Sequence, residues 1–137
     1  MQAPRRFMLD TNIASFIVKG ANDGLKAKLR AYPIGDMCLS AITEGELLFG
    51  LAKRPDATAI KKAVHGLLQL VEVLPWDGGA AQAYGKLRAS LEQQGTSLGN
   101  LDTLIAAHAI ALGSVLVTND KALLRALGEK AEDWSTG

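Results

Sequence analysis

The sequence predicts an α/β fold in which one parallel sheet of four or five strands is sandwiched by helices. Short apolar runs alternate with longer helical patterns along the chain, and this alternation is typical of a parallel sheet. The chain has 137 residues, of which 48% are hydrophobic, a length and composition that suit one globular domain. No internal repeat and no Pro- or Ser-rich linker interrupts the pattern. Residues 1–137 are therefore expected to form a single domain.

Each element of this fold follows from a local pattern. The apolar runs at residues 7–9, 37–39, 71–74 and 115–118 are expected to be buried strands, and a weaker run at 132–134 is a candidate fifth strand. Helical patterns lie between the strands and are separated for the most part by Gly and Pro. They cover residues 12–19, 23–31, 42–53, 57–70, 79–93, 101–112 and 121–127.

Composition excludes several classes of protein. The single cysteine, Cys38, cannot form an intrachain disulfide, and without a Cys/His cluster the chain cannot be a zinc finger. A reducing compartment and a cytoplasmic location are expected. The most apolar stretch, residues 104–117, is shorter than the ~20 residues of a membrane helix. The first residues also lack the apolar segment of a secretory signal, so we expect no membrane attachment and a mature protein that begins here.

Charge gives weaker information. The chain has 15 basic and 14 acidic side chains, a balance that argues neither for nor against nucleic acid. Ten of the basic and six of the acidic residues lie in residues 1–62, so this half could offer a modest positive face to a polyanion. Solvated helix faces explain the same excess equally well.

Four acids fall near the carboxyl ends of the predicted strands, where open α/β sheets form their ligand sites. Asp10 directly ends the first strand, and Asp120 follows the fourth. Glu46 lies in the first turns of the helix after the second strand. Asp102 opens the helix that leads into the fourth strand. The sequence thus predicts four carboxylates at one edge of the sheet.

Each acid also has a purely structural interpretation. Asp10 can form an Asx turn or cap the following helix. Glu46 completes a capping-box pattern with Thr43. Asp102 can complement a helix dipole, and Asp120 can cap the last helix. Taken one at a time, all four are ordinary placements.

Taken together, four carboxylates at one edge would repel one another unless cations neutralise them. Oxygen ligands of this kind suit Mg²⁺ or Mn²⁺. Two such ions about 3.5–4 Å apart can activate water and stabilise the leaving oxygen of a phosphodiester. The pattern therefore indicates nuclease chemistry.

The chain resembles the PIN-domain ribonucleases, specifically the VapC-type toxins of bacterial type II toxin–antitoxin pairs. The matching segments are residues 9–13 (LDTNI), 40–50 (SAITEGELLFG), 99–109 (GNLDTLIAAHA) and 116–120 (LVTND). They occur in the family's order over nearly the whole chain. The segment after Asp120 departs from the family, because related sequences often have an aromatic residue where this chain has KALL.

The resemblance implies a single PIN-like domain, an RNA substrate, Mg²⁺ or Mn²⁺ as cofactor, and an antitoxin as partner. It implies that Asp10 and Asp102 are the principal metal ligands and that Glu46 and Asp120 complete the pocket, Asp120 through water. The family register selects Glu46 over Glu44, which points in nearly the opposite direction on a helix. Residues expected to orient ligands or water are Thr11, Asn12, Ser40 and Thr118. A homodimer is also expected.

Two alternative functions can be distinguished from the ribonuclease by the residues at particular positions. A haloacid-dehalogenase-like phosphatase needs a second Asp two positions after the first, where this chain has Asn12. A catalytically inactive PIN-like module that binds RNA or a partner is expected to have lost pocket acids, yet all four are present. These positions favour the ribonuclease.

The remaining notable residues are interpreted as packing residues. His108 lies about 240° around its helix from Asp102, so a buried packing role is expected rather than general-base catalysis. Cys38 is expected to be a small buried hydrophobe. Trp76 and Trp134 are assigned to the core or to oligomer contacts. An antitoxin helix could occupy a groove between the first and third helices, and the candidates, which could equally be core residues, are Ile13, Phe16, Ile17, Leu47, Leu48 and Leu51.

Overall fold

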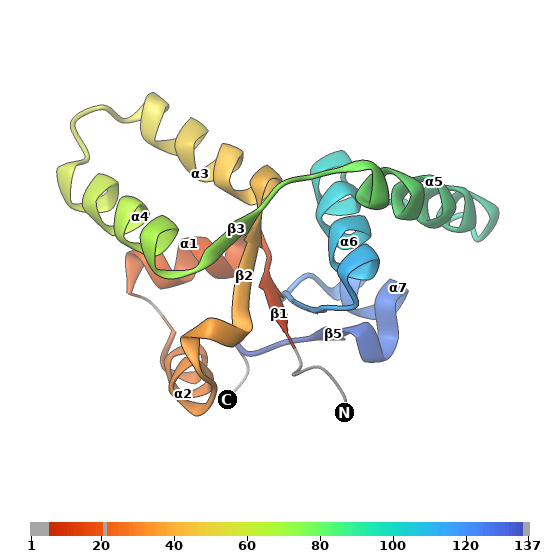
Figure 1. Cartoon of the computed structure of the whole chain (residues 1–137), viewed down its shortest axis with the longest axis horizontal. Coiled ribbons are helices and arrows are strands. Elements are labelled where there is room, and N and C mark those ends of the chain that lie inside the picture. Colours follow the sequence, from red (N-terminus) through yellow and green to blue (C-terminus); the bar gives the residue numbers. More distant parts are fainter. Residues whose placement is uncertain (1–5, 21, 136–137) are drawn as a thin grey trace.

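A computed structural model describes residues 6–20 and 22–135 of the chain. In this range five parallel strands form one sheet with the order β3-β2-β1-β4-β5 (Figure 1). The strands are β1 (Phe7–Leu9), β2 (Met37–Ser40), β3 (Glu72–Leu74), β4 (Val115–Val117) and β5 (Ala131–Glu132). The predicted α/β class is confirmed. The fifth strand lies at 131–132 rather than at 132–134.

Seven α-helices and two short 3-10 helices connect the strands within the described ranges. They are α1 (Thr11–Lys19), α2 (Asp23–Ala31), η1 (Ile34–Asp36), α3 (Ala41–Lys53), α4 (Thr58–Leu70), α5 (Gly78–Gln93), α6 (Asn100–Leu112), α7 (Lys121–Leu127) and η2 (Gly128–Lys130). Every predicted helix is present, with its bounds within one residue of those expected. The sequence patterns did not predict the two 3-10 helices.

The strands divide the core into two layers because successive side chains point to opposite faces of a sheet. In β1, Phe7 and Leu9 pack in a cluster with residues of α1, α2, α3 and α4. Met8, between them, packs on the other face with residues of α6 and α7. Figure 1 shows α1, α3 and α4 on one side of the sheet and α5, α6 and α7 on the other.

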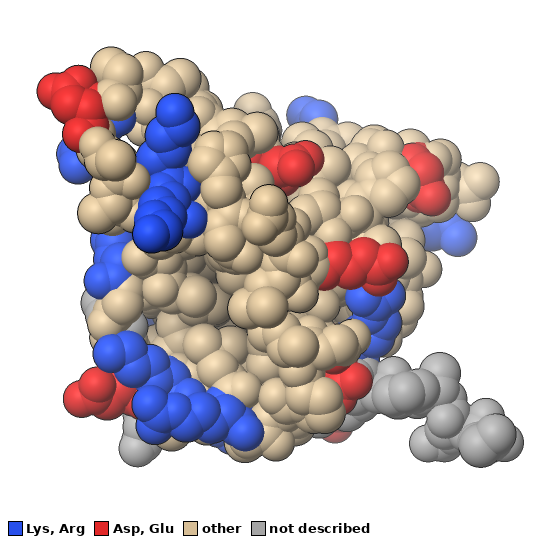
Figure 2. Space-filling view, turned by 60° about the vertical axis from the view of Figure 1, so that its left-hand side comes forward, with Lys and Arg blue, Asp and Glu red and all other residues tan. Residues whose placement is uncertain are grey.

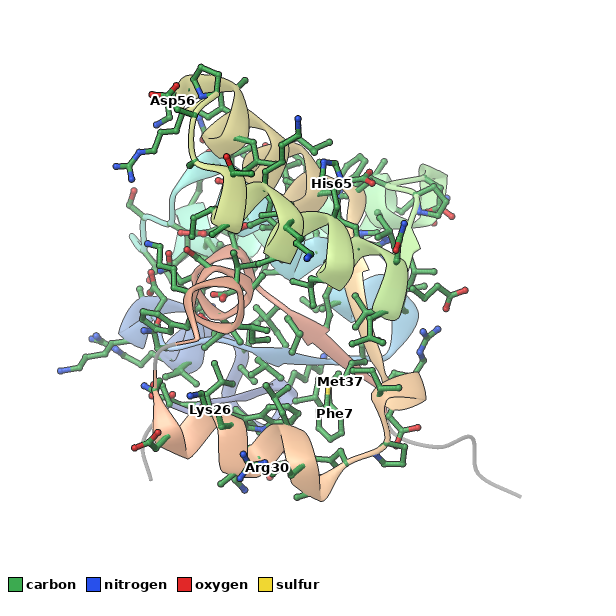
Figure 3. All side chains as sticks on the ribbon, turned by 90° about the vertical axis from the view of Figure 1, so that its left-hand side faces the viewer. Phe7, Lys26, Arg30, Met37, Asp56 and His65 are labelled. Atoms are coloured by element: carbon green, nitrogen blue, oxygen red, sulfur yellow. The ribbon has the colours of Figure 1, made fainter. Side chains whose placement is uncertain are left out.

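Three rings from distant segments pack together in the first of these layers. Tyr32 is stacked on Trp134 with ring centroids 5.3 Å apart, and Phe7 is tilted against both rings. Figure 3 shows Phe7 beside Met37, its partner in the neighbouring strand, close to helix α2. Trp134 is 1% exposed, so its predicted core role is confirmed and it fixes the C-terminal segment against the sheet.

Five helices of the described ranges begin at a polar side chain that caps them, and four of these caps lie at the end of a strand or within three residues of it. The capping residues are Asp10 for α1, Asn22 for α2, Ser40 for α3, Asp77 for α5 and Asp120 for α7. Each side chain accepts a hydrogen bond from a backbone N–H of the first turn, which satisfies a donor that the helix leaves open. Short polar residues are therefore concentrated at the carboxyl edge of the sheet.

Among the helices of the described ranges, none has the length and apolar character needed to cross a membrane.

Two glycines should respond to substitution with opposite signs. Gly113 ends α6 with φ of 65°, a conformation strained for any side chain, so Gly113→Ala should lower the free energy of unfolding by about 1 kcal/mol. Gly66 lies exposed inside α4 with open space around its Cα, so Gly66→Ala should raise that free energy by about 1 kcal/mol. Urea unfolding followed by circular dichroism measures both, and changes of equal sign would contradict the assigned backbone conformations.

Candidate active site: an acidic pocket at the sheet edge

The fold brings the four predicted acids together at the carboxyl edge of the sheet. Asp10 extends β1 by one residue, since its N–H donates to the Val117 carbonyl at 3.0 Å. Asp102 lies in the first turn of α6. The Asp10 carboxylate is repelled by Asp102 and Asp120, and the Asp102 carboxylate is repelled by Asp120 and Glu46. These interactions connect all four carboxylates in one electrostatic network.

Asp10 is the most buried member of the pocket, with 3% of its surface exposed. Its Oδ1 accepts a hydrogen bond from the Ile13 N–H at 2.9 Å, so the expected helix-capping role is also real. The pKa of Asp10 is raised from 3.8 to about 6, mainly by burial and in smaller part by the repulsion of Asp102 and Asp120. Hydrogen bonds from Thr118 and Ile13 act in the opposite direction. The carboxylate is therefore ionised at neutral pH at a cost in stability.

Glu46 is oriented from α1 and not by a capping box. Helix α3 begins at Ala41 and is capped by Ser40, so Thr43 lies inside the helix and the capping-box interpretation is wrong. The Glu46 carboxylate instead accepts a hydrogen bond from the Thr11 hydroxyl at 2.5 Å. Thr11 directly follows Asp10, so this bond ties Glu46 to the pocket.

The side chain of Asp102 lies close to Gly99, the N-cap residue of its own helix. A Cβ atom added at Gly99, the residue that precedes α6, would lie 3.3 Å from Oδ2 of Asp102. Partial burial raises the pKa of Asp102, followed by the repulsion of Asp120 and Glu46. Gly99 thus leaves room for this carboxylate, a role that the sequence pattern did not predict.

Asp120 combines capping with a place in the pocket. Its Oδ1 accepts hydrogen bonds from the N–H groups of Ala122 at 2.8 Å and Leu123 at 3.1 Å, which leaves Oδ2 outside the cap. The N–H of Asp120 donates to the hydroxyl of Thr118 at 3.0 Å. Because Thr118 also bonds to the Asp10 carboxylate, one buried hydroxyl links the two acids.

Two of the four predicted orienting residues contact the acids. Thr11 binds Glu46 and Thr118 binds Asp10, as described above. Asn12 is exposed on α1. Ser40 is buried and bonds to His108, so it does not act on an acid directly. His108 is 1% exposed, which confirms its expected packing location.

The donors of the pocket fit a hard divalent cation. All are oxygens, from four carboxylates and the hydroxyls of Thr11 and Thr118, and Mg²⁺ and Mn²⁺ prefer such ligands. Within residues 6–20 and 22–135 no three His, Cys, Asp or Glu side chains lie close enough to enclose an ion by themselves. Mg²⁺ usually binds through one or two carboxylates and keeps several waters, so this donor set still suits it.

A groove of about 280 Å³ leads away from the pocket between α1, α3 and α4. Thr11 and Glu46 lie at its wall, together with the predicted Leu47 and Leu51. The other four groove candidates are wrong: Ile13 is fully buried in the core, Phe16 and Ile17 pack against it, and Leu48 is exposed outside the groove. Helix α4 supplies Ile60 and Val64 in their place, a neighbour that no local pattern predicts.

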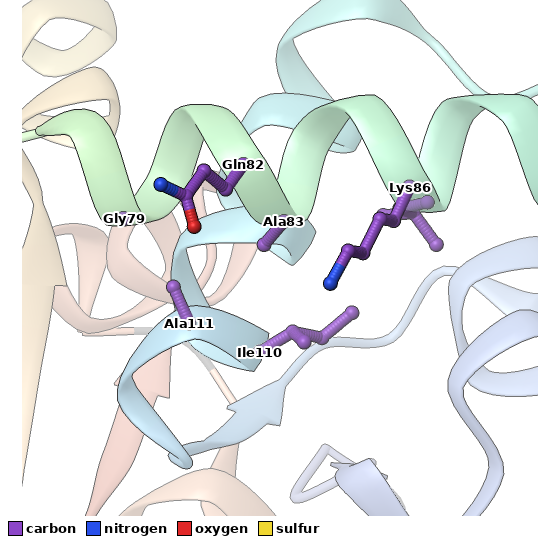
Figure 4. Close-up of a pocket in the computed structure, with 7 residues that line it drawn as sticks. Gly79, Gln82, Ala83, Lys86, Ile110 and Ala111 are labelled. Carbon is purple, nitrogen blue, oxygen red and sulfur yellow. The ribbon is translucent and has the colours of Figure 1, made fainter.

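A cavity larger than this groove lies away from the acids. It measures about 500 Å³ and lies between α5 and α6 (Figure 4). Its lining includes Gln82, Ala83 and Lys86 of α5 and Ile110 and Ala111 near the end of α6, far along the helix from Asp102. Size alone would therefore point away from the acidic pocket, and the chemistry of the side chains identifies the candidate site.

Comparison with known proteins finds the same family over nearly the whole chain. The family model described as PIN domain matches residues 7–129. The chain is 35% identical over 131 residues to the tRNA(fMet)-specific endonuclease VapC of Shigella flexneri, covering 95% of this chain and 98% of the relative. The crystal structure of DNA-bound VapBC from Salmonella typhimurium superposes with a TM-score of 0.86 at 36% identity, covering 96% of this chain and 99% of that chain. VapBC2 from Rickettsia felis, bound to a promoter DNA fragment, gives 0.83 at 30% identity and covers 93% and 98%.

The shifted pKa of Asp10 predicts how the metal-free protein depends on pH. The folded state binds this proton more tightly than the unfolded state, so stability is full below pH 3.8 and is lost as pH rises through about 6. A shift of this size corresponds to about 3 kcal/mol. Asp10→Asn should therefore be more stable than the wild type in EDTA at pH 7, by up to about 3 kcal/mol, and equal to it near pH 4.

Urea unfolding at the two pH values measures this difference. Asp56→Asn is the matched control, because Asp56 is an exposed acid in a turn, and its effect should stay below about 0.5 kcal/mol. A destabilised Asp10→Asn protein at pH 7 would show that the cap, and not the buried charge, dominates at this position.

Proposed function

The chain belongs to the PIN-domain family, and we propose that it is a divalent-metal-dependent ribonuclease that acts as the toxin of a toxin–antitoxin pair. The observation that carries this proposal is the network of four mutually repelling carboxylates in an all-oxygen pocket. The VapC endonucleases and ribonucleases, at 30% to 37% identity, support the reaction. The VapBC complexes among similar structures support the partner.

We assign the site to Asp10, Glu46, Asp102 and Asp120. Asp10 and Asp102 are proposed as the principal ligands of Mg²⁺ or Mn²⁺, and Glu46 and Asp120 complete the pocket, Asp120 through water. Such an ion, when bound, polarises a phosphodiester and lowers the pKa of a coordinated water. The hydroxyl of Thr11 orients Glu46, and that of Thr118 holds Asp10.

The proposed role of these acids, binding a cation, requires them to be ionised. They hold the cation as carboxylates, and a bound cation opposes the burial and repulsion that raise the pKa of Asp10 and Asp102. Because a bound cation lowers the pKa values that burial and repulsion raise, ion binding is coupled to proton release near pH 6. Cleavage is then expected to fall on the acidic side of that pH.

The groove beside Glu46 is proposed as the antitoxin site. Its walls are apolar, with Leu47, Leu51 and Ile60 among the lining residues. Its rim carries Lys19, Lys53 and Arg54, and Lys and Arg side chains gather on the side of the molecule formed by α1 to α4 (Figure 2).

An amphipathic segment fits this groove when its apolar face meets the walls and its acids meet the basic rim. A basic side chain at the Glu46 end would then reach the acidic pocket and compete with the metal or with an RNA phosphate. Inhibitor and substrate thus share one end of the groove. The homodimer expected from the sequence stays a prediction.

The reaction is tested with purified protein and two RNA samples, a mixed pool and tRNA(fMet), the substrate in the name of the Shigella flexneri relative. Cleavage is expected with Mg²⁺ or Mn²⁺ and should stop with EDTA. Glu46→Gln should lower the rate of cleavage about 100-fold, because the pocket that binds the cation then loses one negative charge. Mapped ends identify the bond that is cut.

Glu44→Gln is the matched control for that variant. Glu44 lies on the same helix, two positions away and on another face, so its variant should keep wild-type activity. Activity in excess EDTA, after contaminating nuclease is excluded, would refute the metal-dependent reaction. Full activity of Glu46→Gln together with loss in Glu44→Gln would refute the assignment of Glu46.

The toxin and partner roles are tested in cells. Expression of the chain alone should arrest growth, and Asp10→Asn should relieve the arrest. Coexpression with the small protein encoded beside it should also relieve it. The exposed rim variant Lys53→Glu/Arg54→Glu should stay toxic but escape this relief, because its charges then repel the partner's acids. If neither wild type nor Asp10→Asn slows growth at equal accumulation, the inactive binding module becomes the better assignment.

A further inference from the structure

A buried hydrogen bond connects the two helices that carry Glu46 and Asp102. His108 of α6 is 1% exposed, and its Nδ1 lies 2.8 Å from Oγ of Ser40, which has no exposed surface. Ser40 is the residue that caps α3. The bond therefore joins the start of α3 to the middle of α6.

The protons of this network can be placed from its partners. The His108 ring also bonds to the backbone of Pro75, which has no N–H, so the ring donates to the Pro75 carbonyl. Since Nδ1 faces Ser40, the donor is Nε2, and Nδ1 accepts the Ser40 hydroxyl proton. The Ser40 oxygen in turn accepts from the N–H of Ile42 at 3.1 Å. Burial lowers the pKa of His108, in keeping with a neutral ring.

The network ties three segments: the β2–α3 junction, α6, and the connection from β3 to α5. A second bond strengthens the last contact, because the indole N–H of Trp76 donates to the Leu104 carbonyl in α6 at 3.0 Å. Packing alone does not require an imidazole here. An apolar side chain of similar size would fill the space but leave the Ser40 hydroxyl and the Pro75 carbonyl without this partner.

We propose that His108 is a positioning residue of the acidic pocket, which holds α3 against α6 and so fixes the distance between the Glu46 and Asp102 carboxylates. These two carboxylates repel each other, and α3 and α6 would relieve the repulsion by moving apart. The His108–Ser40 bond resists that movement and keeps the donors close before an ion arrives. The inference rests on the proposed metal-dependent function.

Two substitutions at His108 separate its two hydrogen bonds. The amide of Asn reaches about as far as Nδ1, so His108→Asn can still accept from Ser40. The longer His108→Gln reaches toward Pro75 and loses the Ser40 bond. Ser40→Ala removes the same bond from the other side, together with the cap that Ser40 supplies to α3. Ser114→Ala is the matched control, since it deletes a buried hydroxyl at the far end of α6.

The readout is the Kd for Mn²⁺, measured by electron paramagnetic resonance, beside urea unfolding of each protein in EDTA. His108→Gln and Ser40→Ala should weaken Mn²⁺ binding at least about 10-fold, as loss of a residue that orients ligands does. The double variant should be no weaker than the single ones. The Kd of His108→Asn and of Ser114→Ala for Mn²⁺ should stay within about 3-fold of the wild-type value, even where urea unfolding shows a loss of stability.

The outcomes separate this inference from the function on which it rests. A wild-type protein that neither binds Mn²⁺ nor cuts RNA would overturn both. A wild-type protein that binds Mn²⁺, with His108→Gln and Ser40→Ala less stable but equal to it in Kd, would leave the proposed function intact and reduce His108 to a packing residue. If His108→Gln does not fold, the smaller change Ser40→Ala decides the matter alone.

Discussion

Repulsion among carboxylates at the carboxyl edge of the sheet is the constraint on which the rest of this structure depends. All strands run parallel, so their carboxyl ends meet at one edge, and the helices that follow them begin there. Asp10 takes the most buried place because it follows the central strand. Its pKa is raised first by this burial and then by the repulsion of Asp102 and Asp120.

The protein meets this constraint with hydrogen bonds from its own backbone and hydroxyl groups. Asp10 and Asp120 accept bonds from the first turns of α1 and α7, so the acids that repel one another also start helices. Thr118 links these two acids, and Thr11 holds Glu46. Each of these hydroxyls follows a strand within two residues, and their positions are therefore as rigid as the sheet.

The two layers of the core give the two sides of the sheet different surfaces. The α1–α3–α4 layer carries the groove that ends at Glu46 with its basic rim. The α5–α6 layer carries the larger cavity, remote from the acids, and the hairpin of α5 and α6 supports Asp102. A partner bound in the groove would act on the pocket from one layer while Asp102 stays fixed in the other. The His108–Ser40 bond is a link between these two layers.

The sequence by itself determined the fold class, all seven helices, four strands to within a residue or two, and the four acids as one group. These follow from local signals: apolar periodicity, caps, and the rule that parallel strands end at one edge. Burial of Cys38, His108 and Trp134 also followed from the apolar patterns around them. The resemblance carried by the motifs was specific because it combined segments from the whole chain.

Only the tertiary structure decided which partner each polar group has. The pattern from Thr43 to Glu46 matches a capping box, but Ser40 caps α3 and Thr11, 35 residues away in the chain, binds Glu46. The groove takes its second wall from α4, and Ser40 meets His108 across 68 residues. Such pairs carry no local signal, because the energy of a contact between distant segments depends on the packing of every element between them. A sequence pattern fixes which face a residue occupies, and the assembled layers fix what that face meets.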